Sequence, residues 1–504
     1  MKELVTSERE NGSDNILEDS SERPDPGKRV EMDEGVPEPT KSGKDGNLRE
    51  SLRAIFSWRN YSVYLITSWT YSGFAVIYSF LTLYLLEIEW EFIVIGGVMT
   101  AVAGLMALSR FLGGYVGDVS NRKNLAVIAM LMMATYHLII GLRTETIFIL
   151  GAFALYAFTG IAQGGSSAFI MDNIPREHSG LALSLFRMGS SFGILTLLVF
   201  GALVTTPELF APGFRAIYLF SGVILLICAI GRAVYLEGGS QNNRIREKSI
   251  WRDFLSENRN AVRLIKNAMP AVLAIVVLDG LSDSIFQFGA VLYTGTTLEF
   301  GIPEINIMLL APLVISLPLL FRVGRMSDIM GMKRTTILVY SLMPVCAALL
   351  MVAPTFKYWV PQTIVDIAES LLPGLKIVLT TPFLALLLKY TNDILWGLVL
   401  LTMIQKSMPR TDTAKVLAVF WSIVNIIASI GPLIGGAIFE FLDAPLLFAL
   451  VIVANIVILG GVARYGVEGR EPEDLSEKMQ SMELEIRKLK DEIAEFRSRR
   501  GLSG

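Results

Sequence analysis

The sequence predicts an all-α membrane protein whose twelve transmembrane helices form two pseudo-symmetric six-helix bundles. Hydrophobic residues make up 52% of the 504 residues and charged residues only 18%, which is more apolar than a soluble domain usually is. Apolar stretches of about 20 residues, the length that crosses a bilayer as a helix, recur along the chain. One polar motif also occurs twice, six such stretches apart. The small net charge of −3 argues against nucleic acid as a partner.

Before the first apolar stretch, residues 1–55 predict a disordered cytoplasmic tail. Acidic residues outnumber basic ones there, and Pro, Gly and Ser recur. Such a composition does not supply the apolar surface that a folded core needs. Because no apolar segment follows a basic start, we expect no cleavable secretory signal, and the first spanning helix must direct insertion.

The twelve predicted spans must be helices, because open strands would leave backbone polar groups unsatisfied in lipid. They occupy residues 61–86, 92–116, 124–142, 146–172, 180–204, 214–236, 268–294, 304–323, 334–354, 380–406, 415–439 and 444–464. The first six form an N-terminal bundle within 56–236, and the last six a C-terminal bundle within 268–467. Residues 237–267 are predicted to form a cytoplasmic linker with an amphipathic helix.

The orientation follows from the basic residues, which favour the cytoplasmic connections of a membrane protein. The connections after the second, fourth, eighth and tenth spans are rich in Lys and Arg, as is the long linker, whereas the others carry mainly Glu. Both termini are therefore predicted to be cytoplasmic in a multi-pass plasma-membrane protein. The basic residues in the short connections include Arg110, Arg122, Lys123, Arg176, Arg322, Arg325, Lys333, Arg334, Lys406, Arg410 and Lys415.

The repeated motif follows the second and the eighth predicted spans. Each copy has a Gly, an Asp four residues later, and a basic cluster beginning four to six residues after the Asp. The copies lie at equivalent places in the two bundles, which indicates an internal duplication. Their key residues are Gly114, Asp118 and Arg122 in the first copy, and Gly324, Asp328 and Lys333 in the second.

This motif resembles the signature of the major facilitator superfamily, which is Gly-x-x-x-Asp followed by basic residues. The resemblance covers about residues 60–467 and implies a transporter that works by alternating access. It also implies a conformational latch between the halves formed by Gly114, Asp118, Arg122, Gly324, Asp328 and Lys333. The first copy has Asn121 where the family usually has Gly, so we expect a less tight turn there. For the basic clusters alone, the positive-inside rule is the simpler alternative.

Residues 355–379 are predicted to be an insertion between the ninth and tenth spans. Asp172 to Arg176 align with Lys406 to Arg410 at an offset 24 residues larger than that of the repeated motif. We expect an interfacial helix on the outer face. A re-entrant or an additional spanning segment is the alternative, and it would reverse the topology beyond it.

Charged residues inside predicted spans are the main candidates for function, because an ionised group at mid-bilayer costs at least about 2.5 to 3.5 kcal/mol. Asp279 and Asp283 are four residues apart in the seventh span, so both project from one face. Two acids so placed do not both ionise easily, and one is expected to hold a proton near neutral pH. They are therefore predicted to couple transport to protons, with a static ion pair as the alternative.

Lys389 and Asp393 are likewise four residues apart, in the tenth span. The resemblance places the first, fourth, seventh and tenth helices around a central cavity, which would bring this pair toward the acids of the seventh helix. Arg187 in the fifth span is a candidate contact for a substrate anion, although it can equally extend to the cytoplasmic surface. In the N-terminal bundle, cavity candidates are Trp69, Tyr71 and Gln163.

Two further features bear on direction and assembly. Gly431 to Gly436 resembles the Gly-Pro-rich stretch of antiporter members of the family, although that stretch belongs in helix five and here lies in helix eleven. It favours export, while close helix packing is the structural alternative. In residues 468–504, apolar residues recur at alternating steps of four and three, which predicts a coiled-coil helix and a homo-oligomer. A single amphipathic helix on the membrane is the alternative.

These observations together predict a secondary active transporter for a small organic solute, with proton-coupled efflux of the multidrug or metabolite type. A proton symporter for uptake and a membrane receptor with a transporter-like fold are the alternatives. No enzyme and no cofactor are expected, since no phosphate-binding Gly-x-x-x-x-Gly-Lys-Ser/Thr loop occurs. No metal site is expected, because His137 and His178 form no ligand cluster. The expected partners are the solute, protons and membrane lipid.

Overall fold

The computed structural model describes residues 48–172, 185–186, 188–238, 258–259, 262–263, 265–266, 269–315, 332–372, 374–407 and 413–465. The chain divides into two compact units, residues 1–50 and 51–504. All helices discussed below belong to the second unit, apart from the first three residues of α1 (Leu48–Ser57). Within the described ranges the chain is helical, with one isolated β-bridge between Tyr358 and Thr380. The predicted coiled coil and nearly all of the predicted linker helix lie outside these ranges.

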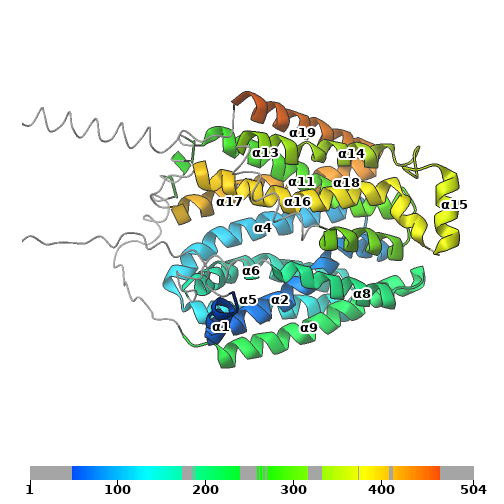
Figure 1. Cartoon of the computed structure of the whole chain (residues 1–504). Coiled ribbons are helices and arrows are strands. Elements are labelled where there is room, and N and C mark those ends of the chain that lie inside the picture. Colours follow the sequence, from blue (N-terminus) through cyan, green and yellow to red (C-terminus); the bar gives the residue numbers. More distant parts are fainter. Residues whose placement is uncertain are drawn as a thin grey trace, which may run out of the picture. The chain divides into compact units, whose positions relative to one another are not determined.

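The N-terminal half is a bundle of long helices, several of them broken into consecutive segments (Figure 1). It consists of α2 (Arg59–Ala75), η1 (Val76–Phe80), α3 (Leu81–Glu87), α4 (Phe92–Val119), α5 (Arg122–Leu142), α6 (Thr146–Asp172), η3 (Met188–Phe192), α8 (Gly193–Leu203), η4 (Pro207–Leu209) and α9 (Phe210–Tyr235). The helix pairs α4 with α6, and α5 with both α6 and α9, form its main packing contacts.

The C-terminal half repeats this plan. It consists of α11 (Pro270–Thr296), an apolar helix at Ile302–Ile315, α13 (Met332–Tyr340), α14 (Leu342–Val352), α15 (Gln362–Leu371), η5 (Leu375–Leu379), α16 (Thr381–Ser407), α17 (Thr413–Ala428), α18 (Gly431–Phe441) and α19 (Pro445–Tyr465). Helix α11 packs on α17, α18 and α19, and α14 packs on α16 and α19.

The helices agree with the predicted spans. Among the described residues, nine helices are long and apolar enough to cross a membrane, and they coincide with the predicted first to fourth, sixth, seventh, ninth, eleventh and twelfth spans. The fifth and eighth spans coincide with shorter apolar helices, Gly193–Leu203 and Ile302–Ile315. The tenth coincides with α16, whose 27 residues include Lys389 and Asp393. An all-helical multi-pass membrane fold is therefore confirmed.

The two halves meet at the end of the bundle that carries α15, called here the α15 end. There the start of α4 crosses α18 at backbone distance, because a Cβ on Gly96 would lie 2.4 Å from the carbonyl oxygen of Pro432 in the first turn of α18. Phe92 stacks on Phe439 with ring centroids 5.4 Å apart. The Asn306 amide also donates to the backbone oxygen of Leu197 at 2.8 Å across the halves. Glycine is required at this crossing because any side chain would separate the helices.

The predicted insertion contains α15, a short helix between α14 and α16. Its ten residues extend about 15 Å, half of what a span needs. Glu369 on α15 pairs with Lys376 at 3.2 Å and accepts a hydrogen bond from the Gly374 backbone, which ties the helix to the segment leading into α16. Ile367 and Leu371 on the same helix are exposed. The interfacial position of this amphipathic helix stays a prediction.

Candidate functional site

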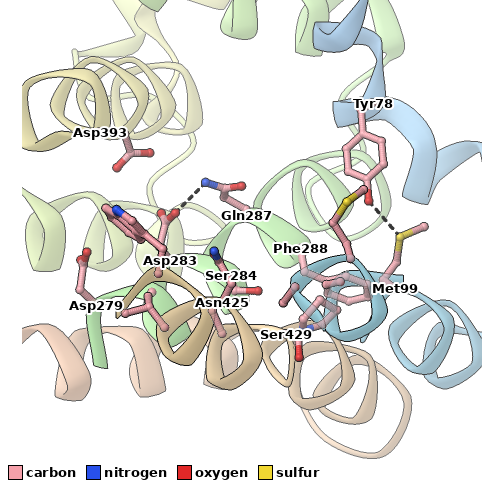
Figure 2. Close-up of a pocket in the computed structure, with 18 of the residues that line it drawn as sticks. Tyr78, Met99, Asp279, Asp283, Ser284, Gln287, Phe288, Asp393, Asn425 and Ser429 are labelled. Atoms are coloured by element: carbon pink, nitrogen blue, oxygen red, sulfur yellow. Dashed lines mark hydrogen bonds between the residues drawn. The ribbon is translucent and has the colours of Figure 1, made fainter. Parts of the chain in front are cut away.

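A cavity of about 560 Å³ lies between the two halves. Segments η1, α3, α4 and α6 line it from the N-terminal half, and α11, α14, α16, α17 and α18 line it from the C-terminal half (Figure 2). Such a volume suits a small organic molecule. Its charged lining residues are Arg110, Asp279, Asp283 and Asp393. Three of the four are residues that the sequence singled out.

Asp279 lies one helical turn before Asp283 on α11, so both carboxylates project from the same face of the helix. Asp279 is only 8% exposed. One of its oxygens accepts a hydrogen bond from the Trp396 indole at 2.8 Å, and the other lies 2.9 Å from the Tyr340 hydroxyl. That hydroxyl also lies 2.8 Å from the side-chain oxygen of Asn455. Neutral donors therefore hold this carboxylate in place.

Lys389 lies between two carboxylates. Its ammonium donates to Asp283 at 2.6 Å and to Asp393 on its own helix. Its side chain is only 2% exposed, whereas those of Asp283 and Asp393 are 34% and 23% exposed. The structure thus brings the pair on α16 to the acids on α11. These three side chains, called here the lysine triad, carry a net charge of −1 when all are ionised.

The triad has two features that matter for proton binding. Both carboxylates line the cavity, while the lysine lies behind them. Asp393 Oδ2 is buried and has no hydrogen-bond partner among the described residues. A buried carboxylate oxygen without a donor is a natural place for a proton, because protonation turns it into a donor and removes the charge. Figure 2 shows Gln287 donating to Asp283, at 2.7 Å.

The N-terminal wall contributes one charge, that of Arg110. Arg110 was predicted to lie in the connection after the second span; this is wrong, because α4 continues to Val119 and Arg110 lies within it. Its guanidinium side chain is exposed to the cavity and donates to the Gln163 side chain at 3.4 Å. Tyr78 and Tyr156 stack beside it at 6.3 Å between ring centroids. The sequence held a signal for this placement. The apolar run of the second span continues past Arg110 through glycines, which indicates that Arg110 lies within the helix.

A second basic residue that sequence reasoning missed is Arg232 on α9. It is 3% exposed and donates to the hydroxyls of Thr67 and Ser68 at 2.8 Å each and to the Ala126 carbonyl at 2.9 Å. Its guanidinium carbon lies 4.3 Å from the centroid of the Tyr64 ring. These contacts join α2, α5 and α9, so Arg232 serves the packing of the N-terminal half.

The predicted cavity candidates of the N-terminal half lie beside the cavity and are not among the described residues that line it. Trp69 donates its indole N–H to the Leu185 carbonyl at 2.8 Å and stacks on Phe192. Tyr71 packs edge-on against His137. Gln163 reaches the cavity only through Arg110. Neighbouring residues of these helices, Tyr78 and Tyr156, line it instead.

The predicted latch is described in part. Gly114 and Asp118 lie in the last turns of α4, and Arg122 begins α5 and donates to the Gly117 carbonyl at 3.2 Å. Asn121 is the N-cap of α5, since its side-chain oxygen accepts from the backbone of Lys123 at 3.0 Å. This gives a physical reason for Asn at a position where the family usually has Gly. Gly324, Asp328 and Arg187 lie outside the described residues, and Lys333 lies in the first turn of α13.

Metal-ligating side chains do not cluster in groups of three or more within the described ranges. The cavity lining offers carboxylates, the guanidinium of Arg110, and hydroxyl, amide and aromatic groups, with Lys389 behind the carboxylates.

Comparison with known proteins identifies the family. The model of the Major Facilitator Superfamily matches residues 62–391. Among solved structures, the nucleoside transporter NupG has a TM-score of 0.60 and 13% identity, covering 80% of this chain and 98% of that one. A POT family transporter in complex with 5-aminolevulinic acid has a TM-score of 0.60 and 10% identity, covering 81% and 96%.

A bacterial homolog of the human lysosomal transporter Spinster has a TM-score of 0.53 and 14% identity, covering 83% of this chain and 97% of that one. At these identities the likeness concerns the fold. No curated protein matches the sequence. The family match, which spans well over half of the chain, agrees with the helical architecture and with the repeated motif, and the chain belongs to the Major Facilitator Superfamily of membrane transporters.

Proposed function

We propose that this chain is a secondary active transporter that exports a small organic solute in exchange for protons. The observation that carries the proposal is the lysine triad, in which one buried ammonium is shared by Asp283 and Asp393 beside the cavity between the halves. Buried charges inside a membrane domain are costly and are typical of ion and proton pathways.

The triad offers a defined proton step. A proton that enters the cavity binds a carboxylate oxygen of Asp283 or Asp393 and converts that carboxylate to a neutral acid. The net charge of the triad then changes from −1 to 0, and Lys389 keeps only one anionic partner. Because Asp283 lies on α11 and Lys389 on α16, a proton on Asp283 weakens an ion pair between two helices that line the cavity, whereas a proton on Asp393 leaves that pair as the remaining one. A change in the pairing of two helices is a means to bias one arrangement of the bundle over another.

Alternating access is supported by the way in which the halves touch. Their described contacts at the α15 end include a glycine crossing, an aromatic pair and two hydrogen bonds, one from the Asn306 amide to Leu197 and one from the Leu433 backbone to the Thr100 hydroxyl. Apolar residues of both halves pack around them. Such contacts can separate without unfolding either half, since each half has helices packed mainly on its own members. The proposed latch, which includes Asp118 and Arg122, would act at the opposite end of α4.

The direction of transport rests on the stretch from Gly431 to Gly436, which resembles that of antiporters. In the structure this stretch packs on α4 through Pro432 and Gly436. Proton-coupled uptake would use the same triad, and a flux measurement separates the two.

The test is solute flux in proteoliposomes with an imposed pH gradient. The full chain would be reconstituted and assayed with a radiolabelled panel of amino acids, organic cations and organic anions. We expect at least one solute to move against its own gradient and opposite to the protons, that is, toward the side from which the protons enter. Asp283→Asn should abolish this driven flux, because the triad can no longer change its charge at that site.

Asp366→Asn is the matched control, since Asp366 is an exposed acid on α15 that accepts from Gln362 and lies far from the cavity lining. Driven flux that survives Asp283→Asn and Asp393→Asn would remove the triad from coupling. Flux in the same direction as the protons would replace export by uptake. If no solute moved, the transport proposal would fail, and a membrane receptor with a transporter-like fold would be favoured instead.

A further inference from the structure

We propose that the cavity binds a solute that carries both charges, an anionic group bound by Arg110 and an ammonium bound at Asp279, with an apolar body between them. The inference rests on the proposed transport function and specifies the class of its substrate. It is argued from the separation of charge between the two walls of the cavity.

The N-terminal wall presents an unused anion-binding group. Arg110 has five N–H donors, and its described contact is a single hydrogen bond of 3.4 Å to Gln163. In the described part of the chain no carboxylate pairs with it. Its side chain is exposed, and it belongs to the cavity lining. A guanidinium with free parallel donors binds a carboxylate in a bidentate manner.

The C-terminal wall presents the opposite charge. Lys389 is already engaged by Asp283 and Asp393, which leaves Asp279 without a cationic partner among the described residues. Asp279 is held by neutral donors, the indole of Trp396 and the hydroxyl of Tyr340. Each carboxylate oxygen keeps further acceptor capacity, and the residue lines the cavity. An ammonium group of a solute can supply both the missing positive charge and further hydrogen-bond donors to the Asp279 carboxylate.

The two groups lie at comparable depth on opposite walls. Arg110 lies nine residues before the end of α4, and Asp279 lies nine residues after the start of α11. Both of these helix termini are at the end opposite to the α15 end, so each group is about 13 Å inside the bundle. The cavity lining around them is apolar or aromatic and includes Met106, Met343, Trp396 and Trp421.

This arrangement disfavours a solute with one charge. A simple organic cation would share the cavity with Arg110, and a simple anion would face the carboxylates of Asp279, Asp283 and Asp393. Like charges in a poorly hydrated cavity repel, and complementary ones confer specificity. A solute with both charges meets an opposite charge on each wall, and an apolar side group matches the remaining lining.

The experiment uses matched sets of three probes that differ only in charge. One set is L-tryptophan, tryptamine and indole-3-propionate, the second is L-phenylalanine, phenethylamine and 3-phenylpropionate, and the third is L-leucine, isopentylamine and 4-methylpentanoate. Binding to the full chain in detergent would be measured by thermal stabilisation across a concentration series. In at least one set we expect the amino acid to bind roughly tenfold or more tightly than its amine and its acid.

The variants assign each charge to its wall. Arg110→Gln should remove the advantage of the amino acid over its amine, while Arg110→Lys should retain part of it. Asp279→Asn should remove the advantage over the acid. Arg143→Gln is the matched control, because Arg143 follows α5 outside the cavity and pairs with Glu145 in an exposed position. Arg110 is exposed, so its variant tests the proposal even if Asp279→Asn fails to fold.

The proposal is overturned if no amino acid binds, if an amine or acid binds as tightly as its amino acid in every set, or if Arg110→Gln leaves the preference intact. Binding in detergent needs no gradient. A chain that binds the amino acid but does not move it in vesicles would therefore retain this inference while defeating the proposed function.

Discussion

Two buried cations, one in each half of the molecule, have opposite surroundings. Lys389 in the C-terminal half is 2% exposed and is paired with Asp283 and Asp393. Arg232 in the N-terminal half is 3% exposed and is held by two hydroxyls, a backbone carbonyl and the ring of Tyr64. Both cations are desolvated to a similar degree. They differ in whether their partner groups can change charge by taking up a proton.

The partners of Arg232 are neutral in the working pH range, so its contacts do not change with pH. The partners of Lys389 are carboxylates, each of which becomes neutral when it takes up a proton. The first arrangement joins helices permanently, whereas the second can be switched by protons. Arg232 therefore fits a role in packing, and Lys389 fits the proposed role in coupling.

Lys389→Met should have the largest effect. It leaves Asp283 and Asp393 facing each other without a cation, which costs about 3–5 kcal/mol when a buried pair loses one partner. The loss should be greatest at high pH, where both carboxylates are ionised, and should shrink as pH falls, because a proton can replace the ammonium. Thermal unfolding in detergent between pH 5 and pH 8.5 measures it. A loss that is the same at every pH would mean that the two acids are already neutral.

Arg232→Met should cost somewhat less, about 2–3 kcal/mol, because three neutral groups lose a charged donor. Its effect should be independent of pH over the same range, since Thr67, Ser68 and Ala126 do not titrate there. The same unfolding series tests this variant beside Lys389→Met. If the loss of stability depended on pH in the same way for both variants, the proposed difference between the two cations would be wrong.

The helices and the triad followed from simple features of the sequence. Span length predicted the long apolar helices that the structure describes, and charge inside spans singled out Asp283, Lys389 and Asp393. Arg110 and Arg232 were missed because each lies near the end of an apolar run, where a basic residue is normally read as a membrane-surface anchor. Their roles depend on which face of the helix they occupy and on what packs there. A membrane helix is apolar both on the side that faces lipid and on the side that packs on protein. Its hydrophobic pattern therefore does not tell which face a given arginine occupies.

The two halves touch at the crossing of α4 and α18. Gly96→Ala would place a Cβ 2.4 Å from the Pro432 carbonyl and should destabilise this closed contact by about 1–3 kcal/mol. Gly97→Ala is the matched control, because a Cβ there meets no atom within 4 Å. Accessibility of an engineered cysteine at Ser429, which lines the cavity, would report the separation. Equal behaviour of the two variants would show that the crossing does not hold the halves together.

Tyr340→Phe should give the smallest change, about 1 kcal/mol, since Asp279 loses one neutral donor and keeps the indole of Trp396. The oxygen that loses the hydroxyl regains acceptor capacity, and Asp279 lines the cavity, so we expect tighter binding of an ammonium probe rather than loss of binding. Titration with tryptamine measures this. Weaker binding would mean that the hydroxyl holds Asp279 in the productive position.

The central claim is that protonation of the lysine triad biases the arrangement of the two halves. The direct measurement is the distance distribution between spin labels at Glu91 and Leu442, which flank α4 and α18 at the α15 end, in a chain with Cys228 and Cys346 replaced by Ser. We expect the distribution to change between pH 8 and pH 5, and Asp283→Asn to show the acid-type distribution at both. A distribution that ignores pH, or one that still responds to pH when Asp283 and Asp393 are both Asn, would contradict the account.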